Sequence, residues 1–418
     1  MNQQQSGKAH RLLPALLAFA CFLMHMSGSL YYNAFGPEVP LMMDFFGRTE
    51  SQIGLVLTVQ AVGTLVASVF LALFGERYNK IHVVCAGLGT LSVCSVAIYL
   101  LSVLFPMGQA RTAIGYLALL CIAFVGGVGF TGVDLMINGV INDVYPRTRA
   151  TLLPIAHAFY GLGAMVIPLI VSRLVDPARP ESFSTPYLVI GLVAAAVVVL
   201  MLVTGNLYRS ETPYADMQAL RQRVSENPAE IFREGRSWLF LLAFSLNFML
   251  LSGVSAWLVT YAQRALAFDY ASASVLMTLF FGGALVMRFA SPLIFRFMPI
   301  RRYVVLMPVL AAVTLGVGFA IGNASLLYVL LPLGGFFQGG LIGAMMLICC
   351  DAFPERSASA ASLASFAIGI STMTTPAIMG AIAERFGFSI PMLGICVSML
   401  LSAPMMWLAM REPGNRKE

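Results

Sequence analysis

Four ionisable residues lie inside stretches of the sequence that are otherwise almost entirely apolar. They are His25, Asp134, His157 and Arg288. A charge inside such a stretch is costly unless it faces a cavity or a partner, so each residue is a functional candidate. A carboxylate and an imidazole can take up and release protons, whereas a guanidinium keeps its proton and acts as a fixed charge. Together these residue types are suited to proton coupling.

Three of the four are predicted at one depth. Asp134, His157 and Arg288 each lie about seven residues, or roughly 10 Å, from the predicted cytoplasmic end of their own segments. With His25 they form a candidate proton-coupling set. Structural alternatives stay open: Arg288 as an anchor for backbone carbonyls or an acid, His157 as a hydrogen-bonding partner of Asn138 or Asp134, and His25 as a neutral packing residue. Asp134 itself could also be purely structural.

The elements that must position these residues are long apolar runs. The chain has 418 residues, of which 59% are hydrophobic and only 11% are charged. A helix needs about 20 mostly apolar residues to cross a bilayer, and the runs lack the short alternating strands of a β-barrel. The sequence therefore predicts an all-α membrane protein with twelve transmembrane helices. The runs cover residues 12–35, 52–74, 81–105, 112–141, 150–173, 186–207, 237–262, 272–295, 301–321, 325–350, 359–383 and 388–410.

The chain divides into two similar halves around its longest polar stretch. "DVYPRT" at 143–148 matches "DAFPER" at 351–356 with an offset of 208, and "LTVQAVGTLV" matches "MTLFFGGALV" with an offset of 220. Parallel six-helix repeats are typical of transporters that rock two halves around a central site. We predict an N-terminal half at 1–207, a cytoplasmic linker at 208–236 and a C-terminal half at 237–418.

This organisation resembles that of the major facilitator superfamily. "FGERYNK" at 74–80 is similar to the superfamily's loop motif after helix 2, with Glu76 in place of aspartate and Asn79 in place of glycine. The resemblance implies twelve helices in two pseudo-repeats. It also implies a conformational latch between helix ends, made by Gly75, Glu76, Arg77 and Lys80.

Residues 134–164, "DLMINGVINDVYPRTRATLLPIAHAFYGLGA", resemble the fucose permease-like branch of that superfamily. The branch carries an acid in helix 4 with an asparagine four residues later, here Asp134 and Asn138. The resemblance implies that Asp134 serves proton-coupled sugar uptake. The branch also has an aspartate late in helix 1, where this chain has Gly36. Glu38 or His25 replaces it, or the coupling differs and leaves antiport or uniport open.

A polar solute requires hydrogen-bonding and aromatic side chains in a central cavity. The resemblance implies that helices 1, 4, 7 and 10 line it. Trp257 and Tyr261 have an alternative role in an interfacial aromatic belt. Abundant Met and Phe could instead line a cavity for apolar drugs. The substrate-binding candidates are Tyr31, Tyr32, Asn33, Gln60, Asn138, Asn247, Trp257, Tyr261 and Gln338.

Several other functions lack the sequence features they need. Gly127, Gly129 and Gly132 match GxGxxG, but a dinucleotide loop follows a strand, whereas these glycines lie within an apolar run and favour close helix packing. There is no Walker A motif, no CxxC pair for a metal and no basic soluble face for nucleic acid. We predict no cofactor, no metal and no enzymatic activity.

We therefore expect a secondary active transporter that moves a small polar solute, such as a sugar, by alternating access and proton-coupled symport. The alternative is a proton-antiport exporter of drugs or metabolites. The expected partners are a small-molecule substrate, protons and the lipid bilayer, with the protein acting as a monomer. Lys and Arg are more frequent in the loops that lie inside if both termini are cytoplasmic. The expected location is the bacterial inner membrane, with that orientation.

Overall fold

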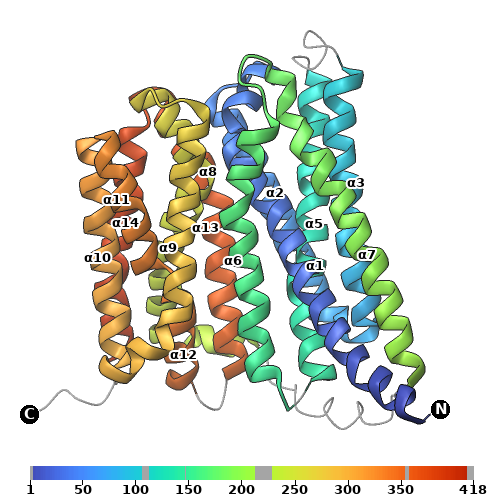
Figure 1. Ribbon diagram of the computed structural model, residues 1–418. Helices are drawn as coiled ribbons and strands as arrows, with labels where there is room; N and C mark the ends of the chain where they lie inside the picture. The colour runs from blue at the N-terminus through green and yellow to red at the C-terminus, as the bar shows by residue number, and fades with distance from the viewer. Residues whose placement is uncertain (1–2, 106–112, 146, 212–227, 354–356, 412–418) are drawn as a thin grey trace, which may run out of the picture. The chain divides into compact units, whose positions relative to one another are not determined.

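The computed structural model describes residues 3–105, 113–145, 147–211, 228–353 and 357–411, which form long helices joined by short connections (Figure 1). No strand occurs among these residues. The α-helices are α1 (Gln3–Phe46), α2 (Glu50–Phe74), α3 (Lys80–Leu104), α5 (Ala113–Val144), α6 (Arg149–Leu174), α7 (Thr185–Glu211), α8 (Gly235–Leu266), α9 (Tyr270–Phe297), α10 (Ile300–Ile321), α11 (Ala324–Gln338), α12 (Leu341–Ala352), α13 (Ser357–Phe386) and α14 (Ser389–Ala409). Three 3₁₀ helices are described as well, η1 (Gly75–Arg77), η2 (Pro180–Ser184) and η4 (Pro228–Arg233).

Twelve spans within the described residues are long and apolar enough to cross a membrane. Large apolar side chains such as Val93, Leu117 and Phe289 point outward, with 69%, 59% and 67% of their surface exposed. Outward apolar side chains along every span are what a surface facing lipid requires. The prediction of an all-α protein with twelve transmembrane helices is confirmed.

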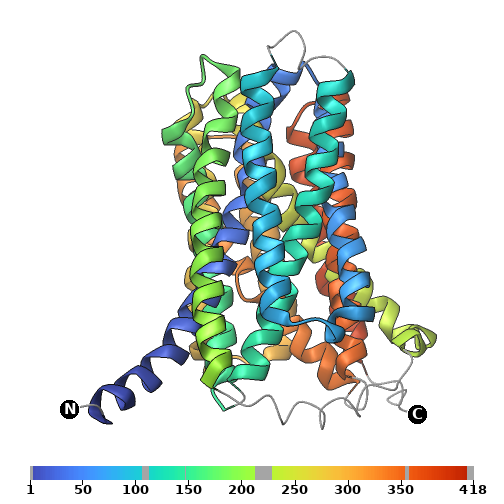
Figure 2. The ribbon, with the colours of Figure 1, turned by 90° about the vertical axis from the view of Figure 1, so that its right-hand side faces the viewer.

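The chain forms two compact units. Unit 1 contains Met1–Phe35, Val59–Ile170 and Leu174–Ser225, and unit 2 contains Gly36–Thr58, Val171–Arg173 and Glu226–Glu418. In unit 1, α3 packs along both α5 and α7, as Figure 2 shows. In unit 2, α8 packs against α13 and α14, and α11 packs against α9 and α10. The unit boundary therefore falls inside α1, and the division at 207 and 237 stays a prediction.

The first helix is longer than the run predicted at 12–35. It continues to Phe46 through Pro37 and Pro40. Membrane helices tolerate proline within their length, and here the Tyr270 hydroxyl donates a hydrogen bond of 2.9 Å to the carbonyl oxygen of Pro37. Glu38 is a fully buried residue of this helix.

The tenth predicted run, 325–350, is two helices rather than one. α11 ends at Gln338 and α12 starts at Leu341, with Gly339 and Gly340 between them. A Cβ atom at Gly339 would lie 2.1 Å from the carbonyl oxygen of Ala284 in α9. Only glycine fits this approach, so the glycine pair both interrupts the helix and lets it touch its neighbour.

The GxGxxG glycines serve helix packing, as predicted. They lie within α5, and a Cβ atom at Gly127 would be 1.9 Å from the carbonyl oxygen of Gln60 in α2. One at Gly129 would be 2.9 Å from the carbonyl oxygen of Gly87 in α3. Since no strand leads into them, they do not form a dinucleotide loop.

Candidate functional site

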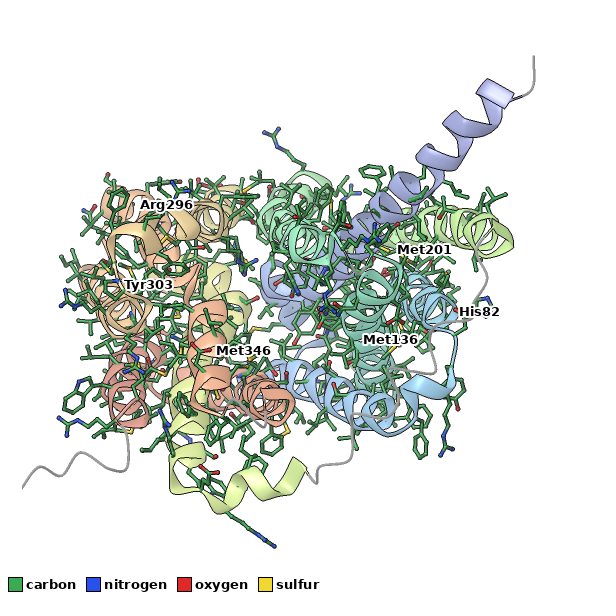
Figure 3. The ribbon with its side chains drawn as sticks, turned by 90° about the horizontal axis from the view of Figure 1, so that it is seen from below. His82, Met136, Met201, Arg296, Tyr303 and Met346 are labelled. Atoms are coloured by element: carbon green, nitrogen blue, oxygen red, sulfur yellow. The ribbon has the colours of Figure 1, made fainter. Side chains whose placement is uncertain are left out.

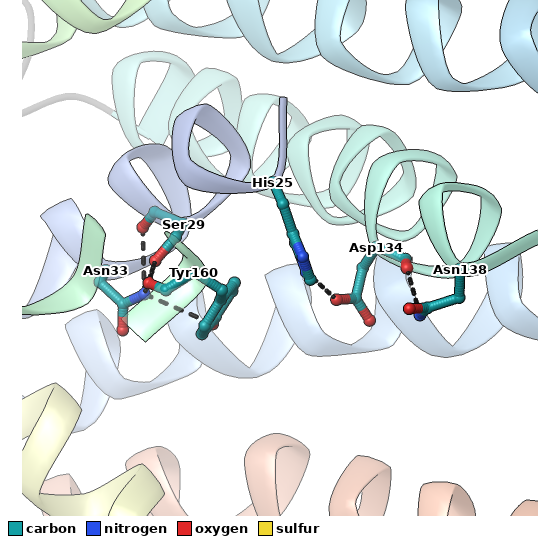
Figure 4. Close-up of polar contacts among 6 residues, drawn as sticks. All are labelled: His25, Ser29, Asn33, Asp134, Asn138 and Tyr160. Atoms are coloured by element: carbon teal, nitrogen blue, oxygen red, sulfur yellow. Dashed lines mark hydrogen bonds and ion pairs between the residues drawn. The ribbon is translucent and has the colours of Figure 1, made fainter. Parts of the chain in front are cut away.

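A carboxylate and an imidazole meet inside unit 1. His25 Nε2 of α1 lies 2.9 Å from Asp134 Oδ1 of α5 (Figure 4). The His25 side chain is 1% exposed and the Asp134 side chain is 35% exposed. Asp134 thus has one buried partner and one open side. An acid in this position can exchange a proton with water while its partner responds to the change in charge.

Local sequence explains why the pair forms. Gly28, one turn after His25, faces Val133 of α5, and a Cβ atom there would be only 3.3 Å from Val133 Cγ1. The small residue allows α1 and α5 to approach closely. That approach brings residues 109 positions apart in the chain within hydrogen-bonding distance.

A second imidazole lies beside this pair. His157 of α6 is exposed, and its ring centroid is 5.0 Å from that of His25 at an interplanar angle of 65°. His157 also interacts electrostatically with Asp134. Three of the four predicted coupling residues therefore come together in unit 1. The structure does not leave His25 as an isolated packing residue.

Arg288, the fourth member of the predicted set, belongs to unit 2. Its Nε donates a 3.3 Å hydrogen bond to the carbonyl oxygen of Gly339, at the break between α11 and α12. A charged donor suits a carbonyl that the broken helix leaves unsatisfied. This contact corresponds to the structural alternative, an anchor on backbone carbonyls, and its role in proton coupling stays a prediction.

A polar cluster follows His25 along α1. Asn33 Nδ2 lies 3.0 Å from the Ser29 carbonyl oxygen, 3.2 Å from Ser29 Oγ and 3.4 Å from the Tyr160 hydroxyl (Figure 4). Ser29 Oγ donates to the carbonyl oxygen of Tyr160 at 2.7 Å. Asn33 is a predicted site residue, but Ser29 and Tyr160 are not. The signal that could have found Ser29 is its spacing, because residues 25, 29 and 33 share one helix face.

The remaining candidates of unit 1 differ in their surroundings. Tyr32 stacks on Phe130 with ring centroids 4.4 Å apart. Asn138 turns back on its own helix, donating to the Asp134 carbonyl oxygen at 2.8 Å. Tyr31 and Gln60 are buried, with 0% and 2% of their surface exposed. Asn138 is thus the predicted residue in direct contact with Asp134, and Tyr32 and Asn33 lie two turns beyond His25 on α1.

In unit 2 the corresponding polar groups are amides. Gln338 Nε2 donates to Asn247 Oδ1 at 3.4 Å, and Asn247 Nδ2 lies 3.3 Å from Met399 Sδ. Both amides are at most 3% exposed. Gln338 is the last residue of α11, directly before the helix break. The structure thus brings together two predicted residues that lie 91 positions apart in the chain.

Trp257 and Tyr261 are buried inside unit 2. Trp257 Nε1 donates to the carbonyl oxygen of Pro376 at 3.1 Å, and the Tyr261 hydroxyl donates to that of Phe319 at 3.2 Å. Both side chains are 0% exposed, so they do not form an aromatic belt at the lipid surface. Their predicted role as substrate contacts is untested by these bonds.

The missing helix 1 aspartate has a steric explanation. A Cβ atom at Gly36 would lie 1.8 Å from the carbonyl oxygen of Ser255, so no larger side chain fits there. Glu38 lies in unit 2, where it interacts electrostatically with Tyr270. His25, in contrast, directly contacts Asp134. The α1 partner of Asp134 is therefore a histidine.

One residue of the predicted latch, Lys80, forms an ion pair with an acid outside the predicted set. Lys80 Nζ at the start of α3 lies 2.9 Å from Asp143 Oδ2 near the end of α5. The Arg77 guanidinium lies 5.2 Å from the Phe74 ring centroid, and Gly75 begins η1. The side chain of Glu76 lies outside the described residues. Asn79 caps α3, accepting a hydrogen bond from the Ile81 amide at 3.0 Å.

No group of three or more His, Cys, Asp or Glu side chains within the described ranges is arranged to hold a metal ion.

Comparison with solved structures identifies several with this fold. A bacterial homologue of the human lysosomal transporter Spinster, inward-facing and unoccupied, has 14% identity and a TM-score of 0.75, covering 96% of this chain and 97% of that chain. A D-xylose–proton symporter has 13% identity and a TM-score of 0.76, covering 96% and 99%. The nucleoside transporter NupG has 13% identity and a TM-score of 0.69, covering 96% and 99%.

A comparison with curated protein sequences found no match. The family model of the Major Facilitator Superfamily matches residues 17–332 and 310–418, which together include almost the whole chain. The twelve spans and the structural likeness agree with that match. The chain belongs to the Major Facilitator Superfamily, whose members are membrane transporters.

Proposed function

We propose that this protein is a proton-coupled symporter of a small polar solute, such as a sugar, of the fucose permease-like type. The observation that carries the proposal is the contact between His25 and Asp134, with His157 beside it. A buried ion pair is poor evidence for stability, because desolvation offsets the attraction. The His25–Asp134 pair is therefore better explained by a role in transport, in which Asp134 changes its charge.

Protonation supplies a two-state element. When Asp134 is ionised it accepts a charge-assisted hydrogen bond from His25, which joins α1 to α5. When Asp134 takes up a proton, that attraction weakens and the α1–α5 contact loses part of its stabilisation. A proton that stabilises the two states differently shifts the equilibrium between them.

The polar cluster supports a hydroxyl-bearing substrate. Ser29, Asn33 and Tyr160 offer donors and acceptors, and the Tyr160 ring centroid lies 5.3 Å from that of His25. Tyr32 and Phe130 add an aromatic surface of the kind on which sugar rings stack. A substrate bound to this cluster would lie close enough to the ionisable pair for the two binding events to influence each other.

We further propose that the protein acts as a monomer in the bacterial inner membrane, with both termini in the cytoplasm. The distribution of Lys and Arg supports this orientation. Proton antiport for export is the second candidate, and it is favoured by the absence of the second acid that the branch carries in helix 1.

Uptake into sealed vesicles tests the proposal. Labelled sugars and other small polar metabolites are supplied with and without an inward proton gradient, to wild type and to Asp134→Asn. We expect the gradient to drive accumulation in wild type, and the variant to retain exchange without accumulation. Asp44→Asn is the matched control, because its side chain is 59% exposed and lies in unit 2.

The outcomes separate the candidates. Accumulation that ignores the gradient, or that persists in Asp134→Asn, rules out symport through Asp134. If substrate leaves the vesicles when protons enter, the antiport alternative replaces it.

A further inference from the structure

A small cavity lies at one end of unit 2, apart from the polar groups described above. It has a volume of about 200 Å³ and lies where α8 and α10 begin and where α12 and α14 end. Figure 3 shows this end of the helices from below. The lining residues are Arg236, Ile300, Arg301, Ile348, Asp351, Ala352 and Met410.

The charges in this cavity are not paired with each other. Within the described residues, neither arginine forms an ion pair with Asp351. Two guanidinium groups and one carboxylate leave a net charge of +1, which a monoanionic group would neutralise. The positive ends of α8 and α10 are offset by the negative ends of α12 and α14, so the two arginines carry the attraction.

A hydrogen bond and two aromatic contacts fix the position of the Arg236 side chain. Its Nε donates to the carbonyl oxygen of Ala409 at 2.5 Å. Its guanidinium carbon lies 5.6 Å from the Phe240 ring centroid and 5.9 Å from that of Phe353. A guanidinium fixed by packing loses little freedom when it binds phosphate oxygens through its remaining N–H groups.

Two tryptophans show that the cavity opens at the level of lipid headgroups. Trp238 is two residues from Arg236 and 55% exposed, and Trp407 is three residues from Met410 and 45% exposed. Exposed tryptophans at helix ends mark the interface between membrane and water. The Arg411 guanidinium stacks over Trp407 at 3.5 Å, as expected for a basic residue at that level. A ligand of this cavity therefore meets headgroups before it meets bulk water.

We propose that this cavity binds the phosphate of an anionic phospholipid headgroup. Arg236 and Arg301 contact the phosphate oxygens, and the apolar residues Ile300, Ile348 and Met410 contact the glycerol region. Basic pockets between membrane helices are suited to such headgroups. Asp351 opposes the phosphate charge, so it limits how tightly the lipid is held.

Native mass spectrometry of the full-length protein tests this site. The protein is equilibrated in detergent micelles containing equal amounts of phosphatidylglycerol and phosphatidylcholine, and the lipid retained is measured. Wild type should retain phosphatidylglycerol in preference. Arg301→Gln and Arg236→Gln should each lower that retention by about fivefold. Arg302→Gln is the matched control, because this exposed neighbour does not line the cavity.

Two further variants keep the test decisive if an arginine variant folds poorly. Asp351→Asn should raise phosphatidylglycerol retention, because it removes the opposing carboxylate. Ala352→Phe should lower it by filling the cavity while leaving every charge in place.

Three results would overturn the proposal. The first is equal loss in Arg302→Gln, which would mean diffuse surface attraction. The second is unchanged retention in Ala352→Phe. The third is displacement of the lipid by inorganic phosphate at matched concentration, which would assign the cavity to a soluble phosphate.

Discussion

The two units differ in the chemistry of their buried polar groups. Unit 1 gathers groups that change charge, the carboxylate of Asp134 and the imidazoles of His25 and His157. Unit 2 gathers the buried amides of Asn247 and Gln338 and the guanidinium of Arg288, and it also holds one buried carboxylate, Glu38. The place where a carboxylate and two imidazoles meet therefore lies in unit 1, and we propose that proton exchange is concentrated there.

The sequence repeat contains a corresponding difference between the two halves. At the offset that pairs Asp143 with Asp351, Asp134 corresponds to Ile342 and Asn138 to Met346. The two repeats thus keep an acid at the ends of corresponding helices but differ in the middle. The proposed coupling residues Asp134 and Asn138 therefore have no counterpart of the same type in the second repeat.

The largest effect on stability is expected from a substitution at Gly36, the first residue of α1 that belongs to unit 2. In Gly36→Ala, the added methyl group would lie 1.8 Å from the Ser255 carbonyl oxygen, so the helices must separate. We expect a loss of about 3 kcal/mol in the free energy of unfolding, measured as a lower thermal midpoint in detergent. Gly89→Ala is the control, because no atom lies within 4 Å of its Cβ position. If Gly36→Ala leaves the thermal midpoint unchanged, this part of α1 has room for a side chain and could have carried an acid.

Arg288→Met tests whether the fixed charge of unit 2 is structural. Removing the donor leaves the Gly339 carbonyl without its 3.3 Å hydrogen bond, which should cost about 2 kcal/mol. The thermal midpoint should fall, while the pH dependence of uptake should stay unchanged. Arg296→Met, at the exposed end of the same helix, provides the comparison. If the pH dependence of uptake changes in Arg288→Met, Arg288 takes part in proton coupling.

His25→Gln tests the titrating side of the comparison. Glutamine can still donate a hydrogen bond to Asp134 but does not ionise. Gradient-driven accumulation should fall by about tenfold, and uptake should vary less between pH 5 and 8, the range in which histidine ordinarily changes charge. His82→Gln removes an exposed histidine and should behave as wild type. Unaltered uptake in His25→Gln would contradict the role of the pair.

The smallest effect is expected at the Lys80–Asp143 ion pair. Its side chains are 15% and 25% exposed, so part of the attraction is screened by solvent. In a double-mutant cycle with Lys80→Met and Asp143→Asn, thermal unfolding should give a coupling energy of about 0.5–1 kcal/mol. A coupling near zero would mean that the latch residues do not act through this contact in the present conformation.

Much of this architecture could be predicted from the sequence. Continuous apolar runs indicated the twelve spans, because a helix that crosses lipid needs one uninterrupted apolar length. Two predicted runs differ from the helices in their details. The first helix continues beyond residue 35 to Phe46. The run 325–350 is one candidate span, but α11 ends and α12 begins within it, at Gly339 and Gly340.

The site was predictable in its residue types, but not in its pairing. Asp134 and His157 stood out because ionisable groups are rare in apolar runs. That His25 contacts Asp134 depends on how α1 crosses α5, which no local pattern encodes. Ser29 and Tyr160 were missed because serine and tyrosine are common in membrane helices, and only their hydrogen bonds distinguish them.

The break at Gly339 and Gly340 also constrains how the protein is made. α11 has 15 residues and α12 has 12, or about 22 Å and 18 Å at 1.5 Å per residue. Neither piece alone spans a hydrocarbon core of about 30 Å. The insertion machinery must therefore accept Ala324–Ala352 as one segment during translation. Because α9 is synthesised first, Arg288 is already in the nascent chain when the Gly339 carbonyl needs its donor.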